Sequence, residues 1–115
     1  MAGTSAYNNT SDGRLKTDVE PIASALEKVL ALQGVTFKWN HDARPEMNLD
    51  DREHLGFIAQ DVEPIVPQAV TEDSEGFKAL AYSDLIPLLV EAVKAQQTQI
   101  TDLTAKVAAL TPKEN

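Results

Sequence analysis

Apolar residues recur with a seven-residue period over the last third of the chain. The pattern runs through four heptads, with the two repeating positions occupied by Ile86, Val93, Ile100 and Val107, and by Leu89, Gln96, Leu103 and Leu110. This a/d pattern predicts a helix over 84–110 that associates as a coiled coil. At about 1.5 Å per residue the helix would extend roughly 40 Å, too long to pack wholly against so small a domain.

These eight positions, called the seam here, leave the partner of the helix open. A helix lying over its own sheet would also carry an apolar stripe, although the heptad length favours a second chain. β-branched residues at a with Leu at d favour two parallel strands, and Gln96 at a d position is a polar residue that sets register. The heptads alone therefore lean weakly to a dimer.

Three segments share the pattern Asp-x-x-Pro, at 18–21, 61–64 and 84–87. Asp caps helices, and Pro is tolerated in the first turn, where its missing N–H has no helical partner. The pattern therefore predicts three helix starts. The first helix would run from Asp18 to a C-cap at Gly34, with apolar residues at helical spacing: Val19, Ile22, Leu26, Val29 and Leu30.

Short apolar runs between these helices predict strands. Residues 35–40 and 54–59 are rich in β-branched, aromatic and apolar residues and flank a polar loop over 41–53. A short helix is expected over 62–66, before Pro67, and a hairpin over 68–72 and 77–82 with its turn at 74–76. The predicted fold class is α+β: a small β-rich head with short helices over 11–83, followed by the long helix 84–110 as the coiled coil.

The composition and charge of the chain argue against several kinds of partner and site. The formal net charge of −8 disfavours nucleic acid and anionic membrane surfaces as partners, and no apolar run approaches the roughly 20 residues of a membrane span. With no Cys and two distant His residues, no metal and no cofactor are expected. Residues 1–10 are polar and without period, typical of an extended tail that belongs to a longer polypeptide upstream.

Three stretches in order resemble a known family. They are SDGRLK from Ser11 to Lys16, LGFIAQDV from Leu55 to Val62, and YSDLIPLL from Tyr82 to Leu89. Together they resemble the intramolecular chaperone domain of phage endosialidases and tail fibres, the S74 peptidase family, from Ser11 to about Leu110. Gly13 departs from the bulkier or charged residue that many relatives carry there.

The resemblance implies a homotrimer, where the heptads alone leaned to a dimer. Residues 1–10 would be the remnant of an upstream fibre or tailspike and 11–115 the chaperone domain, which registers three chains for folding and then cuts itself off between Thr10 and Ser11. It would work in the host cytoplasm during virion assembly, be shed after cleavage, and leave the upstream fibre in the virion tail. The alternative is a trimeric cap or receptor-binding tip that never cuts.

Ser11 and Lys16 are the candidate nucleophile and base. A serine hydroxyl needs a base to take its proton, and a lysine serves only if its pKa is depressed, as in Ser-Lys variants of the catalytic triad. Without the resemblance, this pair would be a turn serine and a surface lysine. Asp12 and Arg14 flank the pair and could shape the loop, although such opposite charges are more often simply solvated.

His54 matches the position of a histidine that the family uses in cleavage. It could polarise the carbonyl, hold Lys16 neutral or protonate the departing amine. On its residues alone it would be a structural or exposed histidine at a strand edge. The resemblance therefore implies a single-turnover serine peptidase with Ser11, Lys16 and His54 as its catalytic residues.

Overall fold

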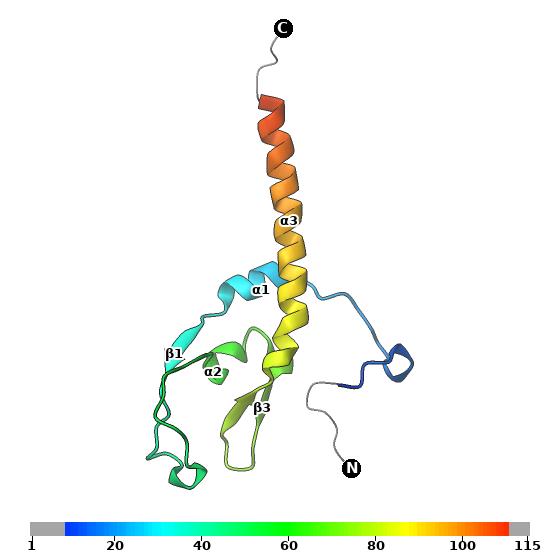
Figure 1. Ribbon diagram of the computed structural model, residues 1–115. Coiled ribbons are helices and arrows are strands. Elements are labelled where there is room, and N and C mark those ends of the chain that lie inside the picture. The colour runs from blue at the N-terminus through cyan, green and yellow to red at the C-terminus, as the bar shows by residue number, and fades with distance from the viewer. Residues whose placement is uncertain (1–8, 111–115) are drawn as a thin grey trace.

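The computed structural model describes residues 9–110, so most of the predicted fibre remnant 1–10 lies outside the described residues. The chain combines short helices, two small sheets and one long helix (Figure 1), which confirms the α+β class. In chain order the elements are η1 Gly13–Leu15, α1 Ala25–Ala31, β1 Val35–Phe37, η2 Pro45–Met47, β2 His54–Gly56, α2 Ala59–Val62, η3 Pro67–Ala69, β3 Val70–Glu72, β4 Lys78–Leu80, η4 Tyr82–Asp84 and α3 Leu85–Leu110.

The long helix α3 begins one residue after Asp84 and confirms the predicted span. Pro87 occupies its third position, where a missing N–H leaves no helical bond unmade. The first turns of α3 pack against the head through Leu85, Leu88 and Ala92, whereas its C-terminal half projects away from the head (Figure 1). Among residues 9–110, the head therefore anchors the N-terminal end of the helix.

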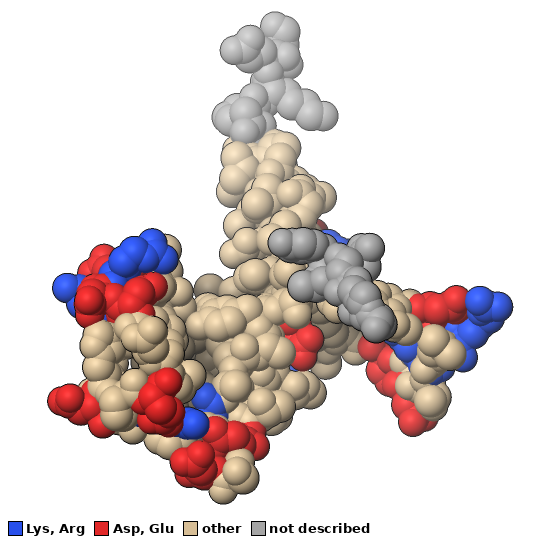
Figure 2. All heavy atoms as spheres, turned by 60° about the horizontal axis from the view of Figure 1, so that its bottom comes forward, with Lys and Arg blue, Asp and Glu red and all other residues tan. Residues whose placement is uncertain are grey.

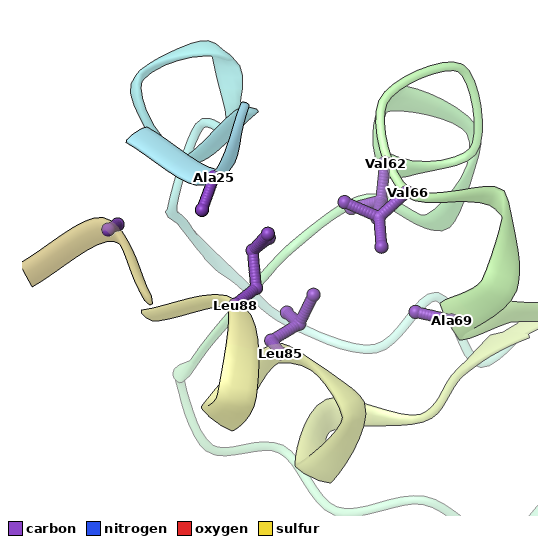
Figure 3. Packing of buried hydrophobic residues seen from close by; sticks show 7 residues of the cluster. Ala25, Val62, Val66, Ala69, Leu85 and Leu88 are labelled. Atoms are coloured by element: carbon purple, nitrogen blue, oxygen red, sulfur yellow. The ribbon is translucent and has the colours of Figure 1, made fainter. Parts of the chain in front are cut away.

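The core is small and lies where α3 meets the head. Its buried side chains point toward one another from α1, from α2 and the turn that follows it, from η3 and from α3 (Figure 3). The members are Ala25, Val62, Val66, Ala69, Leu85, Leu88 and Ala92. Most of these side chains are small or medium in size, so the head depends on a few close contacts with the base of α3.

Two separate two-stranded antiparallel sheets form the β part of the head. Strand β1 pairs with β2, with Phe37 opposite His54, and β3 pairs with β4, with Val70 opposite Leu80. The predicted hairpin and the two other predicted strands are confirmed, although each strand is only three residues long, and the pairing of β1 with β2 was not predicted. Gly76 in the hairpin turn has a φ of +88°, a conformation that favours glycine.

The helix predicted over 18–34 is present, but both of its predicted ends are wrong. Asp18 and Ser24 have φ angles of +54° and +56°, which an α-helix cannot accommodate, so α1 begins only at Ala25. Gly34 does not cap the helix, because α1 ends at Ala31 and Leu32 is already extended. The apolar residues within 19–22 have helical spacing, but they do not face the core and are exposed.

The second Asp-x-x-Pro segment is also not a helix start. Asp61 lies within α2, which begins at Ala59 and replaces the predicted helix over 62–66. The chain after α2 continues only as a turn, in which the N–H of Val66 donates to the carbonyl oxygen of Val62 at 2.8 Å. Of the three predicted starts, only the one at Asp84 is right.

The loop over 41–53 is tied to the β3–β4 hairpin by Arg44. Its guanidinium lies 3.2 Å from Asp73 Oδ2 and 3.6 Å from Glu75 Oε1, and it covers the ring of Phe77 at 4.7 Å from the ring centroid. Asp73 in turn accepts the N–H groups of Glu75 and Phe77, which closes the hairpin turn. The two sheets of the head are therefore linked by one arginine as well as by the core.

The chain is extended rather than compact. Its radius of gyration is 20.5 Å, whereas a compact domain of about 100 residues has one of about 13 Å. Two parts of the chain increase the radius of gyration. One is the projecting end of α3, and the other is residues 9–24, called the arm here, which are exposed throughout and extend away from the rest of the head on one side (Figure 1). Within the described residues, no helix is long and apolar enough to cross a membrane.

Candidate functional site

The short turn η1 brings Ser11 and Lys16 together. The side chain of Asp12 caps the turn by accepting the N–H of Arg14 at 2.9 Å, and the N–H of Lys16 donates to the carbonyl oxygen of Gly13 at 3.2 Å. As a result, Lys16 Nζ lies 2.7 Å from Ser11 Oγ and donates a hydrogen bond to it. The two predicted catalytic side chains are thus within the distance at which a proton can pass between them.

Asp12 and Arg14 brace this turn rather than contacting the pair. Arg14 donates to both carboxylate oxygens of Asp12, at 3.1 and 2.9 Å, and the pair is exposed to solvent. The hydrogen bonds from the Arg14 side chain and then from its N–H lower the pKa of Asp12, and the same contact raises the pKa of Arg14. Gly13 at the centre faces open space, so its small size is not required by any neighbouring atom.

His54 lies in a different setting, on the inner side of β2. Its ring stacks on Phe37 at 5.5 Å between centroids and lies 5.6 Å from Trp39, and Phe37 and Trp39 pack edge to face. Nε2 of His54 lies 2.8 Å from Asp50 Oδ1, and this hydrogen bond is the main cause of the lowered pKa of Asp50. A histidine fixed in this way by a carboxylate and two aromatic rings has a defined ring orientation.

Asp50 was not predicted from the sequence as a site residue. Its spacing of four residues before His54 was a signal, because an acidic residue near a histidine often fixes its tautomer. Its other partner is the N–H of Arg52, which donates to the same oxygen at 3.0 Å. His41 joins this loop through a contact of Nε2 with the carbonyl oxygen of Asp50 at 3.0 Å.

The structure does not bring His54 to the Ser11–Lys16 pair within one chain. Figure 1 shows η1 on one side of α3 and the β1–β2 sheet on the other. The hydrogen bonds of residues 11–16 that the described part of the chain contains are all made inside that segment. One chain therefore holds the three predicted catalytic residues in two separate places.

The eight seam residues of α3 are exposed in the single chain. The exposed fractions are 60% for Ile86, 47% for Leu89, 61% for Val93, 55% for Ile100, 59% for Leu103, 63% for Val107 and 82% for Leu110, and Gln96 is exposed as well. The head packs against other residues of α3, namely Leu85, Leu88 and Ala92. Figure 3 shows Leu85 and Leu88 among the core side chains. Figure 2 shows that charged side chains gather on the outlying parts of the molecule, whereas the face of α3 in view is almost free of them.

Residues 9–110 contain no group of three or more His, Asp or Glu side chains arranged to hold a metal ion. One groove along α3 is shallow and largely apolar, and it is formed by Pro21 and Ile22 of the arm with Ile86 and Val90 of α3. Such a surface suits contact with another polypeptide better than recognition of a small polar ligand. The arrangement can therefore support two activities: proton transfer at Ser11 and association through α3.

Residues 11–71 match the family described as chaperone of endosialidase. The chain belongs to this family. The match begins at Ser11 and ends within β3, so it contains the Ser11–Lys16 pair, His54 and most of the head. The resemblance noted in the sequence is thereby confirmed.

This member of the chaperone of endosialidase family is similar to long tail fiber proteins of phages. It is 39% identical over 102 residues to Gp37 of Enterobacteria phage K3 and to Gp37 of Enterobacteria phage T2, an alignment that covers 84% of this chain. It is 32% identical over 85 residues to Gp37 of Escherichia phage AR1, covering 72% of this chain. The chain spans only 7–8% of the length of these three relatives.

Proposed function

We propose that this chain is the intramolecular chaperone of a phage tail fibre, which forms a homotrimer and then releases itself by cleavage between Thr10 and Ser11. The observation that carries the proposal is the 2.7 Å contact between Lys16 Nζ and Ser11 Oγ at the first residues of the family match. Ser and Lys at this distance on a capped turn form a nucleophile with its base already in reach. Membership of the family and the fibre relatives supply the chaperone role.

The exposed surface of the chain supports association through α3. The chain exposes 9655 Å², whereas a compact monomer of 12.5 kDa is expected to expose about 6,200 Å². The apolar seam residues are part of this exposed surface, and they line one helical face over four heptads. Three copies of α3 packed along this face would cover it, with the heads arranged around the base of the bundle.

Cleavage is a single event that requires only Ser11, Lys16 and water, and no cofactor. Lys16, as a neutral amine, takes the proton of Ser11 Oγ, and this oxygen adds to the carbonyl carbon of Thr10. The bond between that carbon and the Ser11 nitrogen breaks, and the departing amine takes up the proton. Water then hydrolyses the ester between Thr10 and Ser11, giving the carboxylate of Thr10 and restoring the hydroxyl of Ser11.

Trimerisation and cleavage act in sequence during assembly in the host cytoplasm. A trimer formed at α3 holds three upstream chains close together, so their pairing becomes effectively intramolecular and the entropic cost of registering a long shaft falls. Cleavage then removes the folding template and leaves the fibre kinetically trapped in the virion tail. The shed domain takes no further part.

The test is the intact mass of the freshly expressed chain beside Ser11→Ala and Lys16→Ala, with native mass for the oligomer. Ser74→Ala and Lys38→Ala are matched controls, because both residues are exposed and lie outside η1. The proposal expects a trimer in which the wild type and both controls lose residues 1–10 and the two site variants do not. An intact trimer in all five would instead establish a cap or receptor-binding tip that never cuts.

A further inference from the structure

The arm presents the Ser11–Lys16 pair without any cover. Every residue from 9 to 24 is exposed, and the apolar side chains Leu15 and Val19 are 71% and 74% exposed. A lysine acts as a base only when it is shielded from water or placed beside another cation, because water stabilises its charged form. The single chain supplies the contact between the two side chains but not this shielding.

The direction of the arm is set by the backbone where it joins the head. Ser24, with its φ of +56°, turns the chain away immediately before α1, and Asp18 turns it again. Strand β1 leaves from the other end of the same helix. Each copy therefore presents its arm on one side of α3 and its β1–β2 sheet on the other (Figure 1).

The β1–β2 sheet carries a surface able to receive the arm. Trp39 is 40% exposed and lies beside His54, so an apolar patch borders the histidine. With Nε2 directed to Asp50, the second ring nitrogen of His54 has no hydrogen-bond partner among residues 9–110. The patch and this nitrogen together offer an apolar contact and a proton-carrying group at one place.

We propose that the cleavage site is completed between two copies of the chain: the arm of one copy packs against the β1–β2 sheet of the next, where His54 of that neighbour meets the Ser11–Lys16 pair. This proposal rests on the self-cleaving trimer proposed above. Around a threefold axis through the α3 bundle, an arm on one side and a sheet on the other form a head-to-tail contact that closes after three copies. All three sites are then equivalent.

The contact would supply what the single chain lacks. Leu15 and Val19 would be covered by the neighbour, and water would be excluded from Lys16, which favours its neutral form. His54 of the neighbour would give a proton to the amine of Ser11 as the bond to Thr10 breaks, and Asp50 would stabilise the protonated ring. Cleavage would therefore wait for assembly.

Complementation between two inactive variants tests this directly. Ser11→Ala lacks the nucleophile but keeps His54, and His54→Ala keeps the nucleophile. When the two are co-expressed with different mass tags, the His54→Ala chain should be cut and the Ser11→Ala chain should stay intact. At equal expression, about half of the His54→Ala chains have a Ser11→Ala copy as the relevant neighbour, so cleavage should approach about half of that chain.

Lys16→Ala paired with Ser11→Ala is the matched control. Ser11 and Lys16 lie on the same arm, so this pair should give no cleaved product. If the His54→Ala chain stays intact in mixed trimers while wild type is cut, the site lies within one chain and the proposal fails. Rescue in both mixtures would also overturn it, because the arms would then meet one another. A wild type that is not cut refutes the proposed function instead.

Cross-linking tests the docking of the arm whether or not the chain cuts. The sequence contains no Cys, so Leu15→Cys on the arm and Arg52→Cys beside Asp50 can be placed in separate chains and mixed. A disulfide between the two chains is expected within the trimer, whereas Leu15→Cys mixed with Lys106→Cys, on the projecting end of α3, should give none. Absence of the first link, or equal yields of both, would overturn the proposal.

Discussion

Helix α3 has one face packed in the core and another that is exposed. Substitutions on the two faces should therefore separate folding of the head from association of the chains. Leu88 is 4% exposed and packs in the core, whereas Leu103 is 59% exposed and lies on the projecting part. Leu88→Ala removes three buried carbons at about 0.8 kcal/mol each and leaves a cavity, so the head should lose about 2.5–4 kcal/mol. This is a large part of the roughly 5–15 kcal/mol that a domain possesses.

Leu103→Ala should leave the head unchanged and weaken the trimer. Association would cover about 60% of the same three carbons, worth about 1.4 kcal/mol per chain and about 4 kcal/mol per trimer. The trimer dissociation constant should therefore rise roughly a thousandfold.

Two measurements distinguish these effects. Fluorescence of Trp39, the single tryptophan of the chain, reports the head during urea unfolding, and sedimentation over a range of concentrations reports the oligomer. The urea titrations are made well below the dissociation constant of the wild-type trimer, so that association does not add to the stability of the head, whereas the sedimentation runs span the dissociation constants of both proteins. Two results would refute the division of α3 into two faces. One is a Leu103→Ala variant with an unchanged oligomer, and the other is a Leu103→Ala variant whose Trp39 unfolding transition moves to lower urea concentration, as that of Leu88→Ala should.

Other substitutions test local features of the head. Gly56→Ala should cost about 1–3 kcal/mol, because a Cβ there would lie 2.5 Å from the hydroxyl of Tyr82, whereas Gly13→Ala in open space should change urea stability by less than about 0.5 kcal/mol. Asp73→Ala removes the acceptor of two backbone N–H groups, and it should cost about 1–2 kcal/mol in the same urea titration. Asp50 and Asp73 have lowered pKa values in the fold. Their contribution to the free energy of unfolding is therefore present above the unfolded pKa of about 3.9 and is lost as the pH falls below it. Trp39 fluorescence measured against pH should show acid unfolding that begins below about pH 4.

The sequence predicted the elements whose pattern is long or is supported by turn residues. The heptads gave α3 to within one residue, because a sustained period over four heptads has no competing interpretation. The hairpin was found because its turn residues and flanking strands agree, and Gly76 has the positive φ that such a turn requires. The resemblance pointed to Ser11 and Lys16 as a pair, and in the structure a spacing of five residues across a capped turn brings the two side chains into contact.

The first helix shows where the same reasoning fails. Residues 19–30 have helical spacing, yet only the part from Ala25 onward faces the core, and left-handed residues at 18 and 24 break the rest. Period and capping residues report what a segment could bury, and they do not say whether a surface is present to bury it. Asp50 was missed for a related reason, since its contact with His54 depends on the fold of the 41–53 loop rather than on a motif.

The misread segment is also the one on which the timing of the proposed cleavage depends. A chaperone that cut before its three chains were in register would release them unpaired, so cleavage has to be slower than assembly. The arm carries Val19 and Leu15 with the spacing of buried residues, but the single chain buries neither. If a neighbouring copy covers them, as we propose, the shielding that Lys16 needs arises only in the assembled trimer. Apolar positions that mislead a prediction for one chain would then be the signal for a contact between chains, and the exposure of the pair would itself delay the cut until assembly.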